Sequence, residues 1–205
     1  MTGIFISFEG IDGVGKSTQA DLLETWLKEQ GKAVVRTFEP GGTDVGVEIR
    51  KILLHHKGDL APRAEAALFA ADRAHHVQSL IAPALARGEI VITDRYFDSS
   101  VAYQGAGRDL SRTEVRDLSL WAVGGLLPNL TVLLDLPADK AMARRNKTGV
   151  EPDRLEKEKT EFFETVRSAY LDLAASEPKR FLVIDASVTV EEMQTQIRDR
   201  VAGLI

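Results

Sequence analysis

The sequence of 205 residues contains no cysteine, which excludes disulfide bonds and thiolate metal sites. It also lacks any apolar run near the length of about 18 residues that marks a membrane span. The first ten residues, MTGIFISFEG, lack the basic stretch and long apolar core of a signal peptide. The net charge of −5 predicts no broad basic surface for duplex nucleic acid. These absences indicate a cytoplasmic protein without a membrane or nucleic-acid partner.

The composition is otherwise that of an ordinary globular domain, with 44% hydrophobic and 28% charged residues. The length suits one compact domain over residues 1–205. No repeat, low-complexity tract or linker interrupts it. One segment stands apart, residues 144–154 (RRNKTGVEPDR), which places four cations in a polar stretch. We expect a mobile surface segment there.

Short apolar runs alternate with longer amphipathic segments along the chain. Strands are expected at residues 4–8, 33–37, 90–93, 131–136 and 181–184, and helices at 17–30, 43–56, 62–87 and 189–202. Strands separated by helical crossovers predict an α/β fold whose parallel sheet is covered on both faces. Ligands of such sheets bind beyond the carboxyl ends of the strands.

The segment Gly10–Ser17 (GIDGVGKS) follows the first expected strand, precedes a helix and matches the pattern G-x-x-x-x-G-K-[ST]. Glycines let the backbone turn so that successive N–H groups point at phosphates, while Lys16 reaches the β- and γ-phosphates and Ser17 can ligate Mg²⁺. The motif predicts binding of a nucleoside triphosphate and a P-loop NTPase fold, a three-layer α/β/α arrangement whose middle layer is a five-stranded parallel sheet. The expected ATP-binding residues here are Gly10, Ile11, Asp12, Gly13, Val14, Gly15, Lys16, Ser17 and Thr18.

A P-loop alone leaves GTPases, motor-type ATPases and small-molecule kinases open. The sequence contains no Asn-Lys-x-Asp guanine-reading motif, and its third expected strand runs into Asp94-Arg95-Tyr96 instead of an Asp-Glu pair. Asp94 at a strand end can hold Mg²⁺ through water, and Arg95 suits a second phosphate group. This arrangement favours a kinase, although a structural salt bridge at Arg95 is the alternative.

Several stretches together carry a resemblance that covers nearly the whole chain. They are residues 8–19 (FEGIDGVGKSTQ), 39–43 (EPGGT), 68–73 (LFAADR), 94–96 (DRY), 99–100 (SS), 102–105 (AYQG) and 153–156 (DRLE). In these motifs and their spacing the chain resembles the thymidylate kinase family. The resemblance implies ATP-dependent phosphorylation of dTMP to dTDP in dTTP biosynthesis, with Mg²⁺ as cofactor and a homodimeric enzyme.

The resemblance also implies roles for individual residues. Phe69 and Arg73 share a helical face, so a pyrimidine could stack on Phe69 while Arg73 donates to its O4. The alternative is a core phenylalanine beside a surface cation. Tyr103 would pack under the sugar, and Arg95 with Arg50 would bind the dTMP phosphate. The full set of implied substrate-binding residues is Asp12, Glu39, Pro40, Arg50, Phe69, Arg73, Arg95, Ser99, Ser100, Tyr103 and Gln104. The implied metal ligands are Ser17, and Asp12 and Asp94 through water.

Some members of the family carry an arginine in the P-loop where this chain has Gly13. The chain is therefore similar to the branch that supplies cations from a lid, here residues 144–154. The expected catalytic residues are Lys16, Asp94, Arg95, Arg145 and Arg154, while Arg144 and Ala186 are expected to contact adenine. The four histidines, His55, His56, His75 and His76, are expected at the surface.

Two other functions stay open from the sequence. One is another P-loop nucleotide or nucleoside kinase, and the other is a nucleotide-dependent switch protein. The segment Val115–Leu127 and the helix at 62–87 are apolar enough to form the interface of a dimer.

Overall fold

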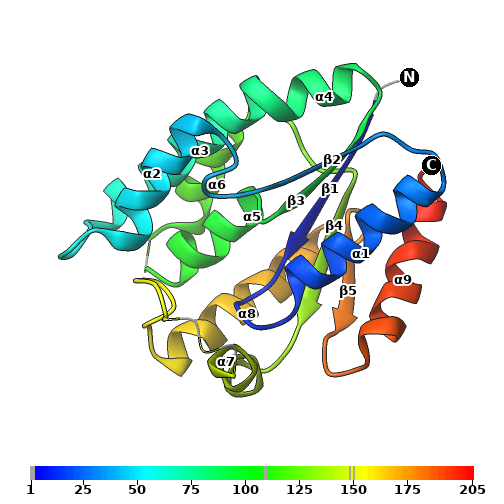
Figure 1. Cartoon of the computed structure of the whole chain (residues 1–205). Coiled ribbons are helices and arrows are strands. Elements are labelled where there is room, and N and C mark those ends of the chain that lie inside the picture. Colours follow the sequence, from blue (N-terminus) through cyan, green and yellow to red (C-terminus); the bar gives the residue numbers. More distant parts are fainter. Residues whose placement is uncertain (1–2, 109, 148, 150) are drawn as a thin grey trace.

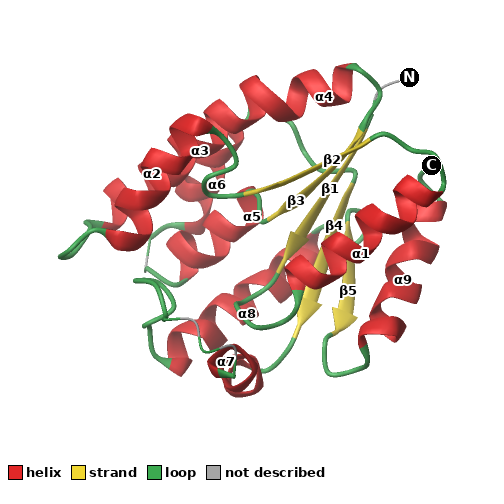
Figure 2. Ribbon diagram, in the orientation of Figure 1, coloured by secondary structure: helices red, strands yellow, loops and turns green. Residues whose placement is uncertain are grey.

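The computed structural model describes residues 3–108, 110–147, 149 and 151–205. Its strands form one parallel sheet in the order β2-β3-β1-β4-β5, which confirms the predicted α/β fold (Figures 1 and 2). The strands are β1 (Ile4–Glu9), β2 (Val34–Phe38), β3 (Ile90–Asp94), β4 (Leu130–Asp135) and β5 (Phe181–Asp185). β1 lies in the centre, with β3 and β2 on one side of it and β4 and β5 on the other. The loop after β1 therefore lies at the point where the order of strands in the sheet reverses. That is the position where parallel sheets bind ligands.

Helices cover both faces of this sheet (Figure 1). α1 and α9 pack together on one face, and α4 and α8 contact strands from the other. The helical elements are α1 (Lys16–Glu29), α2 (Asp44–His55), α3 (Pro62–His76), η1 (Val77–Ile81), α4 (Ala82–Ala86), α5 (Phe97–Ser100), η2 (Val101–Ala106), α6 (Arg112–Ala122), α7 (Ala138–Asn146), α8 (Thr160–Ser176) and α9 (Val190–Ala202).

The core follows from the alternation of side chains along the strands. Ile6 and Phe8 of β1 belong to the cluster that includes Leu23 and Leu27 of α1. Phe5, one residue away, joins a second cluster with residues of η1 and β3. Both faces of the central strand are thus buried, as expected for a parallel sheet between two helical layers.

The helix expected over 62–87 differs from a regular α-helix. It is α3, then a π-helical turn in η1, then the short α4. Pro83 lies at the start of α4 and has no N–H, so it cannot donate to the carbonyl one turn before it. The wider π-helical turn of η1 lies directly before α4, where this backbone hydrogen bond is missing.

The expected surface position is wrong for one of the four histidines. His76 is completely buried, with ring nitrogens 2.7 Å from Thr37 Oγ1 and 2.9 Å from Glu39 Oε1. His55 and His56 are exposed and His75 is half-buried. The sequence pattern around His76 gave no sign of its two partners because both lie more than thirty residues earlier in the chain.

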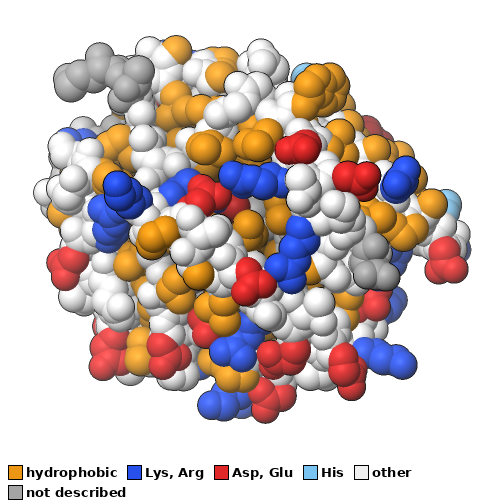
Figure 3. Space-filling view, turned by 180° about the vertical axis from the view of Figure 1, so that it is seen from behind, with side chains coloured by type: hydrophobic (Ala, Val, Ile, Leu, Met, Phe, Trp, Pro, Cys, Tyr) orange, Lys and Arg blue, Asp and Glu red, His pale blue; other side chains and the backbone are white. Residues whose placement is uncertain are grey.

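The outer surface is mixed in character. In the face shown in Figure 3, acidic and basic side chains are interspersed with apolar ones. Within the described ranges, no helix has the length and apolar character that a membrane crossing requires.

Candidate functional site

The P-loop connects β1 to α1, and its glycines are required by its geometry. Gly10, Gly13 and Gly15 all have positive φ angles, of 131°, 87° and 98°. A Cβ on Gly13 would lie 2.2 Å from the carbonyl oxygen of Ala141 in α7, and one on Gly10 would lie 2.5 Å from that of Leu134. A side chain at either position would collide with backbone, so the loop can have this shape only with glycine there.

The polar groups of the P-loop converge where α1 begins. Lys16 Nζ donates to the carbonyl oxygens of Gly10 (3.0 Å) and Ile11 (2.9 Å), and Ser17 Oγ donates to Asp94 Oδ2 at 2.6 Å. Burial lowers the pKa of Lys16, although nearby carboxylates act in the opposite direction. The loop, the helix N-terminus and the end of β3 thus face one open space.

We call that space the P-loop cleft. The residues that line it are Asp12, Gly13, Gly15, Lys16, Ser17, Thr18, Asp21, Arg36, Thr37, Phe38, Glu39, Arg50, Asp94, Arg95, Arg144, Arg145 and Glu156. Ile11 and Val14, also expected in the ATP site, are buried in the main core cluster. Their side chains therefore support the loop from beneath, and only their backbone can serve a ligand.

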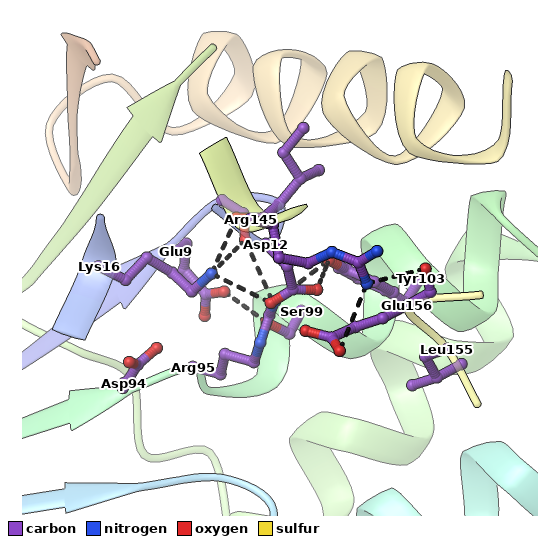
Figure 4. Close-up of polar contacts among 12 residues, drawn as sticks. Glu9, Asp12, Lys16, Asp94, Arg95, Ser99, Tyr103, Arg145, Leu155 and Glu156 are labelled. Carbon is purple, nitrogen blue, oxygen red and sulfur yellow. Dashed lines mark hydrogen bonds and ion pairs between the residues drawn. The ribbon is translucent and has the colours of Figure 1, made fainter. Parts of the chain in front are cut away.

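Arg95 stands at the junction of the site, directly after β3 (Figure 4). It has a left-handed φ of 68°, unusual for a residue with a side chain. Its Nη2 donates to Asp12 Oδ1 at 2.6 Å and to Tyr103 Oη at 3.1 Å, and Tyr103 Oη donates to Asp12 Oδ2 at 3.2 Å. Burial alone would raise the pKa of Asp12, but the charges of Arg95 and Lys16 lower it overall.

A second cavity, the inner cavity, adjoins the P-loop cleft. It is lined by Asp12, Glu39, Pro40, Arg50, Leu54, Phe69, Arg73, Arg95, Ser99, Ser100, Tyr103, Gln104, Asp153, Leu155 and Glu156. All the residues expected to bind the acceptor substrate therefore surround one cavity, although they come from five separate segments. Their individual roles stay predictions.

The pair Phe69 and Arg73 on α3 shows how this cavity is built. Arg73 is 1% exposed, so it is not a surface cation. Its Nε donates to Glu39 Oε2 at 2.6 Å and its Nη1 to Ser100 Oγ at 3.2 Å. Phe69 is both a core residue and a wall of the cavity. Arg50 and Pro40 also line this cavity, and Arg50 Nη1 donates to the carbonyl oxygen of Pro40 at 2.7 Å.

The cations expected in the lid lie in two different places. Arg144 and Arg145 line the P-loop cleft, where Arg144 Nη1 donates to the carbonyl oxygen of Ala186 at 2.8 Å and Arg145 Nη1 to that of Glu156 at 3.0 Å. Arg154 instead pairs with Glu65 and donates from Nε to the carbonyl oxygen of Leu53 at 2.9 Å. Two residues of the expected lid, Thr148 and Val150, lie outside the described residues.

Glu9 was not predicted as part of the site, yet it lies at its base. It is fully buried and accepts from the N–H of Tyr96 (2.8 Å), from Ser99 Oγ (2.6 Å) and from Tyr170 Oη (3.0 Å). Ser99 and Tyr170 also accept from Arg95 Nη1, at 3.1 and 3.4 Å. The signal in the sequence was a charged residue closing an apolar strand just before the P-loop; Tyr170 carried no signal.

The residues of the cleft fit a magnesium ion. Ser17 Oγ and Asp94 Oδ2 are hard oxygen ligands held together at the phosphate end of the cleft. In the described part of the chain, no group of three or more His, Asp or Glu side chains could hold a metal by itself. Mg²⁺ usually keeps several waters and takes further ligands from phosphates, so the donors found here suit it.

A P-loop cleft that opens onto a second, arginine-lined cavity defines a P-loop kinase, because it provides one place for the triphosphate and another for a phosphorylated acceptor. The comparisons with known proteins agree. The family model described as "Thymidylate kinase" matches residues 8–197. The chain belongs to the thymidylate kinase family and is a phosphotransferase, a nucleotide kinase that uses ATP.

Individual relatives extend along the whole chain. The thymidylate kinase of Leifsonia xyli subsp. xyli (strain CTCB07) is 64% identical over 203 residues, covering 99% of this chain and 96% of the relative. That of Clavibacter sepedonicus is 60% identical over 205 residues, covering 100% and 97%. The crystal structure of thymidylate kinase from Ehrlichia chaffeensis matches with a TM-score of 0.79 at 30% identity, covering 98% of this chain and 99% of that one.

The buried carboxyl of Glu9 predicts a pH-dependent stability. Burial, reinforced by the charge of Asp98, raises its pKa from 4.5 to about 7. Between these values the folded protein holds a proton that the unfolded chain has released, so Glu9 contributes less to the free energy of unfolding as pH rises toward about 7. Glu9→Gln should remove this effect, so wild type should lose about 1 kcal/mol per pH unit relative to the variant in this window.

Urea unfolding at several pH values from 5 to 8 measures that difference. The control is Glu48→Gln, which changes an exposed carboxylate paired with Lys51 and should follow the pH dependence of wild type. A constant difference between wild type and Glu9→Gln across the window would show that Glu9 is ionised throughout.

Proposed function

We propose that this enzyme transfers the γ-phosphoryl group of ATP to dTMP, with Mg²⁺, to give ADP and dTDP for dTTP biosynthesis. The observation that carries the proposal is the wall that the two cavities share. Asp12, Glu39, Arg50, Arg95 and Glu156 line both the P-loop cleft and the inner cavity. A triphosphate on one side and a monophosphate on the other would therefore meet at Asp12 and Arg95.

The chemistry of the inner cavity suits a thymine base. Phe69 offers an aromatic face for stacking, and the buried guanidinium of Arg73 can donate to a carbonyl such as O4. Ser100 and Gln104 add polar groups at the same wall. Hydrogen bonds in a buried pocket discriminate strongly, because a wrong base leaves protein groups without partners.

The sugar and phosphate of dTMP would lie toward the shared wall. Tyr103 would pack under the sugar and disfavour a 2′-hydroxyl, and Asp12 would accept from the 3′-hydroxyl. Arg95 and Arg50 would bind the phosphate, a role that suits the planar fork of a guanidinium. The ion pair between Arg95 and Asp12 supports this role because it fixes the arginine before substrate arrives.

The transfer step requires alignment more than covalent chemistry. An oxygen of the dTMP phosphate attacks the γ-phosphorus in line, and the bond to the β-phosphate oxygen breaks to release ADP. Mg²⁺ held by Ser17 and, through water, by Asp12 and Asp94 would offset negative charge. Lys16 and the arginines of the segment 144–154 would stabilise the transition state, as in the branch that carries its cations in the lid. A closed lid would also exclude water.

A panel of acceptors tests the proposed reaction. ADP formation with Mg²⁺–ATP should be fastest with dTMP and much slower with dUMP, UMP, dCMP, AMP, GMP and thymidine. Preference for another acceptor would assign the chain to another kind of nucleotide or nucleoside kinase. Tight ATP binding without turnover on any acceptor would favour a nucleotide-dependent switch protein.

The lid cations are tested by removal of single arginines. Arg154→Ala should lower kcat at least about a hundredfold with little change in fold, because an inserted arginine contributes about 10³ to 10⁵ in related phosphoryl transfers. The variant also loses the partner of the buried Glu65, so its thermal stability should fall and kcat is measured on folded protein. Arg145→Ala provides the comparison, since Arg145 lines the P-loop cleft and Arg154 does not. A normal kcat for Arg154→Ala together with a low one for Arg145→Ala would move the role to Arg145.

A homodimer is also part of the proposal, and a cytoplasmic location stays a prediction. Trp121 at the end of α6 is 79% exposed, an unusual position for a large aromatic side chain. The same helix lines one side of a groove between α3 and α6, whose residues are Arg63, Ala66, Leu110, Glu114, Val115 and Leu118. Light scattering should give twice the mass of one chain, and Trp121→Glu should reduce it to a single chain mass.

A further inference from the structure

Glu65 is a buried carboxylate that none of the family motifs includes. It lies on α3, one turn before Phe69, and is only 1% exposed. Three side chains from three other parts of the chain donate to it: Gln104 of η2, Arg108 after it, and Arg154 before α8. A buried carboxylate is retained only when such partners compensate for its lost hydration.

The chemistry of these partners fixes how Gln104 is turned. Glu65 Oε1 accepts from Gln104 Nε2 at 3.0 Å and from Arg108 Nε at 3.3 Å, while Oε2 accepts from Arg154 Nη2. Arginine can only donate, so both carboxylate oxygens are acceptors here. The amide of Gln104 must therefore turn its NH₂ group toward Glu65, which leaves its Oε1 at the other end.

Gln104 itself is 1% exposed and lines the inner cavity. Among the described residues, no hydrogen bond reaches its Oε1. An amide that could turn over would present either an acceptor or a donor to a ligand. Because the contact with Glu65 holds the NH₂ group on one side, the other end of the amide presents Oε1, an acceptor.

We propose that Glu65 is a positioning residue for base selection, and the inference rests on the proposed function. By holding the Gln104 amide in one orientation, Glu65 makes the cavity accept a pyrimidine whose ring nitrogen carries a hydrogen, as N3 of thymine and uracil does. A pyrimidine with a bare ring nitrogen, as in cytosine, would set two acceptors against each other. Facing acceptors leave both without a partner in a buried site, which is costly.

The test is Glu65→Gln, compared with wild type on dTMP and dCMP. A glutamine at residue 65 can donate as well as accept, so the Gln104 amide is free to turn and donate to the ring nitrogen of cytosine. The preference, the ratio of kcat/KM for dTMP to that for dCMP, should fall about tenfold or more. Arg73 is untouched by the change, so part of the preference should persist.

The ratio separates base selection from other effects of the same change. Loss of the Glu65 contact also disturbs Arg154, but this effect lowers kcat/KM equally for dTMP and dCMP and cancels in their ratio. A change in the fraction of folded enzyme cancels in the same way. Glu158→Gln is the matched control, because Glu158 shares the partner Arg108 (2.5 Å) and has no contact with Gln104 among the described residues. Its preference should equal that of wild type.

A double-mutant cycle tests whether Glu65 acts through Gln104. In a Gln104→Leu background, Glu65→Gln should leave the preference unchanged. If Glu65→Gln does not accumulate as folded protein, Glu65→Asp is the second variant. It keeps the negative charge but draws the carboxylate back by one methylene group from its partners, Gln104 included, and should lower the preference in the same direction.

The outcomes separate the inference from the proposed function. An unchanged preference in a folded Glu65 variant, or an equal fall in the Gln104→Leu background, would overturn the inference alone. A wild-type enzyme with no preference for dTMP would overturn the proposed function and this inference with it.

Discussion

The ion pair between Asp12 and Arg95 is the interaction on which the site depends. It joins the P-loop to the end of β3, so the two cavities share one wall. Arg95 adopts a left-handed conformation that is unfavourable for a residue with a side chain. The bond from the N–H of Tyr96 to Glu9, and those from Arg95 to Ser99 and Tyr170, hold it there. The buried residues Glu9, Ser99 and Tyr170 thus hold the pair in place before any substrate binds. Phosphoryl transfer requires charges that are oriented in this way beforehand.

The inner cavity shows the same design. Its polar side chains are connected to one another by hydrogen bonds. Glu39, for example, accepts from both Arg73 and His76. Removing one member of such a chain leaves the others buried without partners. The preferences of the cavity therefore depend on residues that a ligand never touches, and Glu65 is the clearest of them.

The sequence predicted most of the sheet, because short apolar runs between amphipathic segments are typical of buried parallel strands joined by helices. It also predicted the P-loop and the residues around the inner cavity, through local motifs. It could not predict the burial of His76, nor the parts played by Tyr170 and Glu65. Those depend on partners far along the chain, which only the folded arrangement brings together. The segment 144–154 was predicted as one unit, but its arginines lie in two places. Arg144 and Arg145 lie at the P-loop cleft, where they donate to backbone carbonyls, whereas Arg154 pairs with the carboxylate of Glu65.

The contacts inside the P-loop have a thermodynamic consequence. Lys16 holds two carbonyl groups of its own loop, and Ser17 holds Asp94. The Lys16 ammonium has three N–H donors, so one of them is left over for a phosphate, and the Ser17 oxygen can ligate a cation while its hydrogen stays on Asp94. Both side chains are therefore held in place before a ligand arrives and need not give up their partners to receive it. Binding at this loop then costs little free energy for reordering the protein.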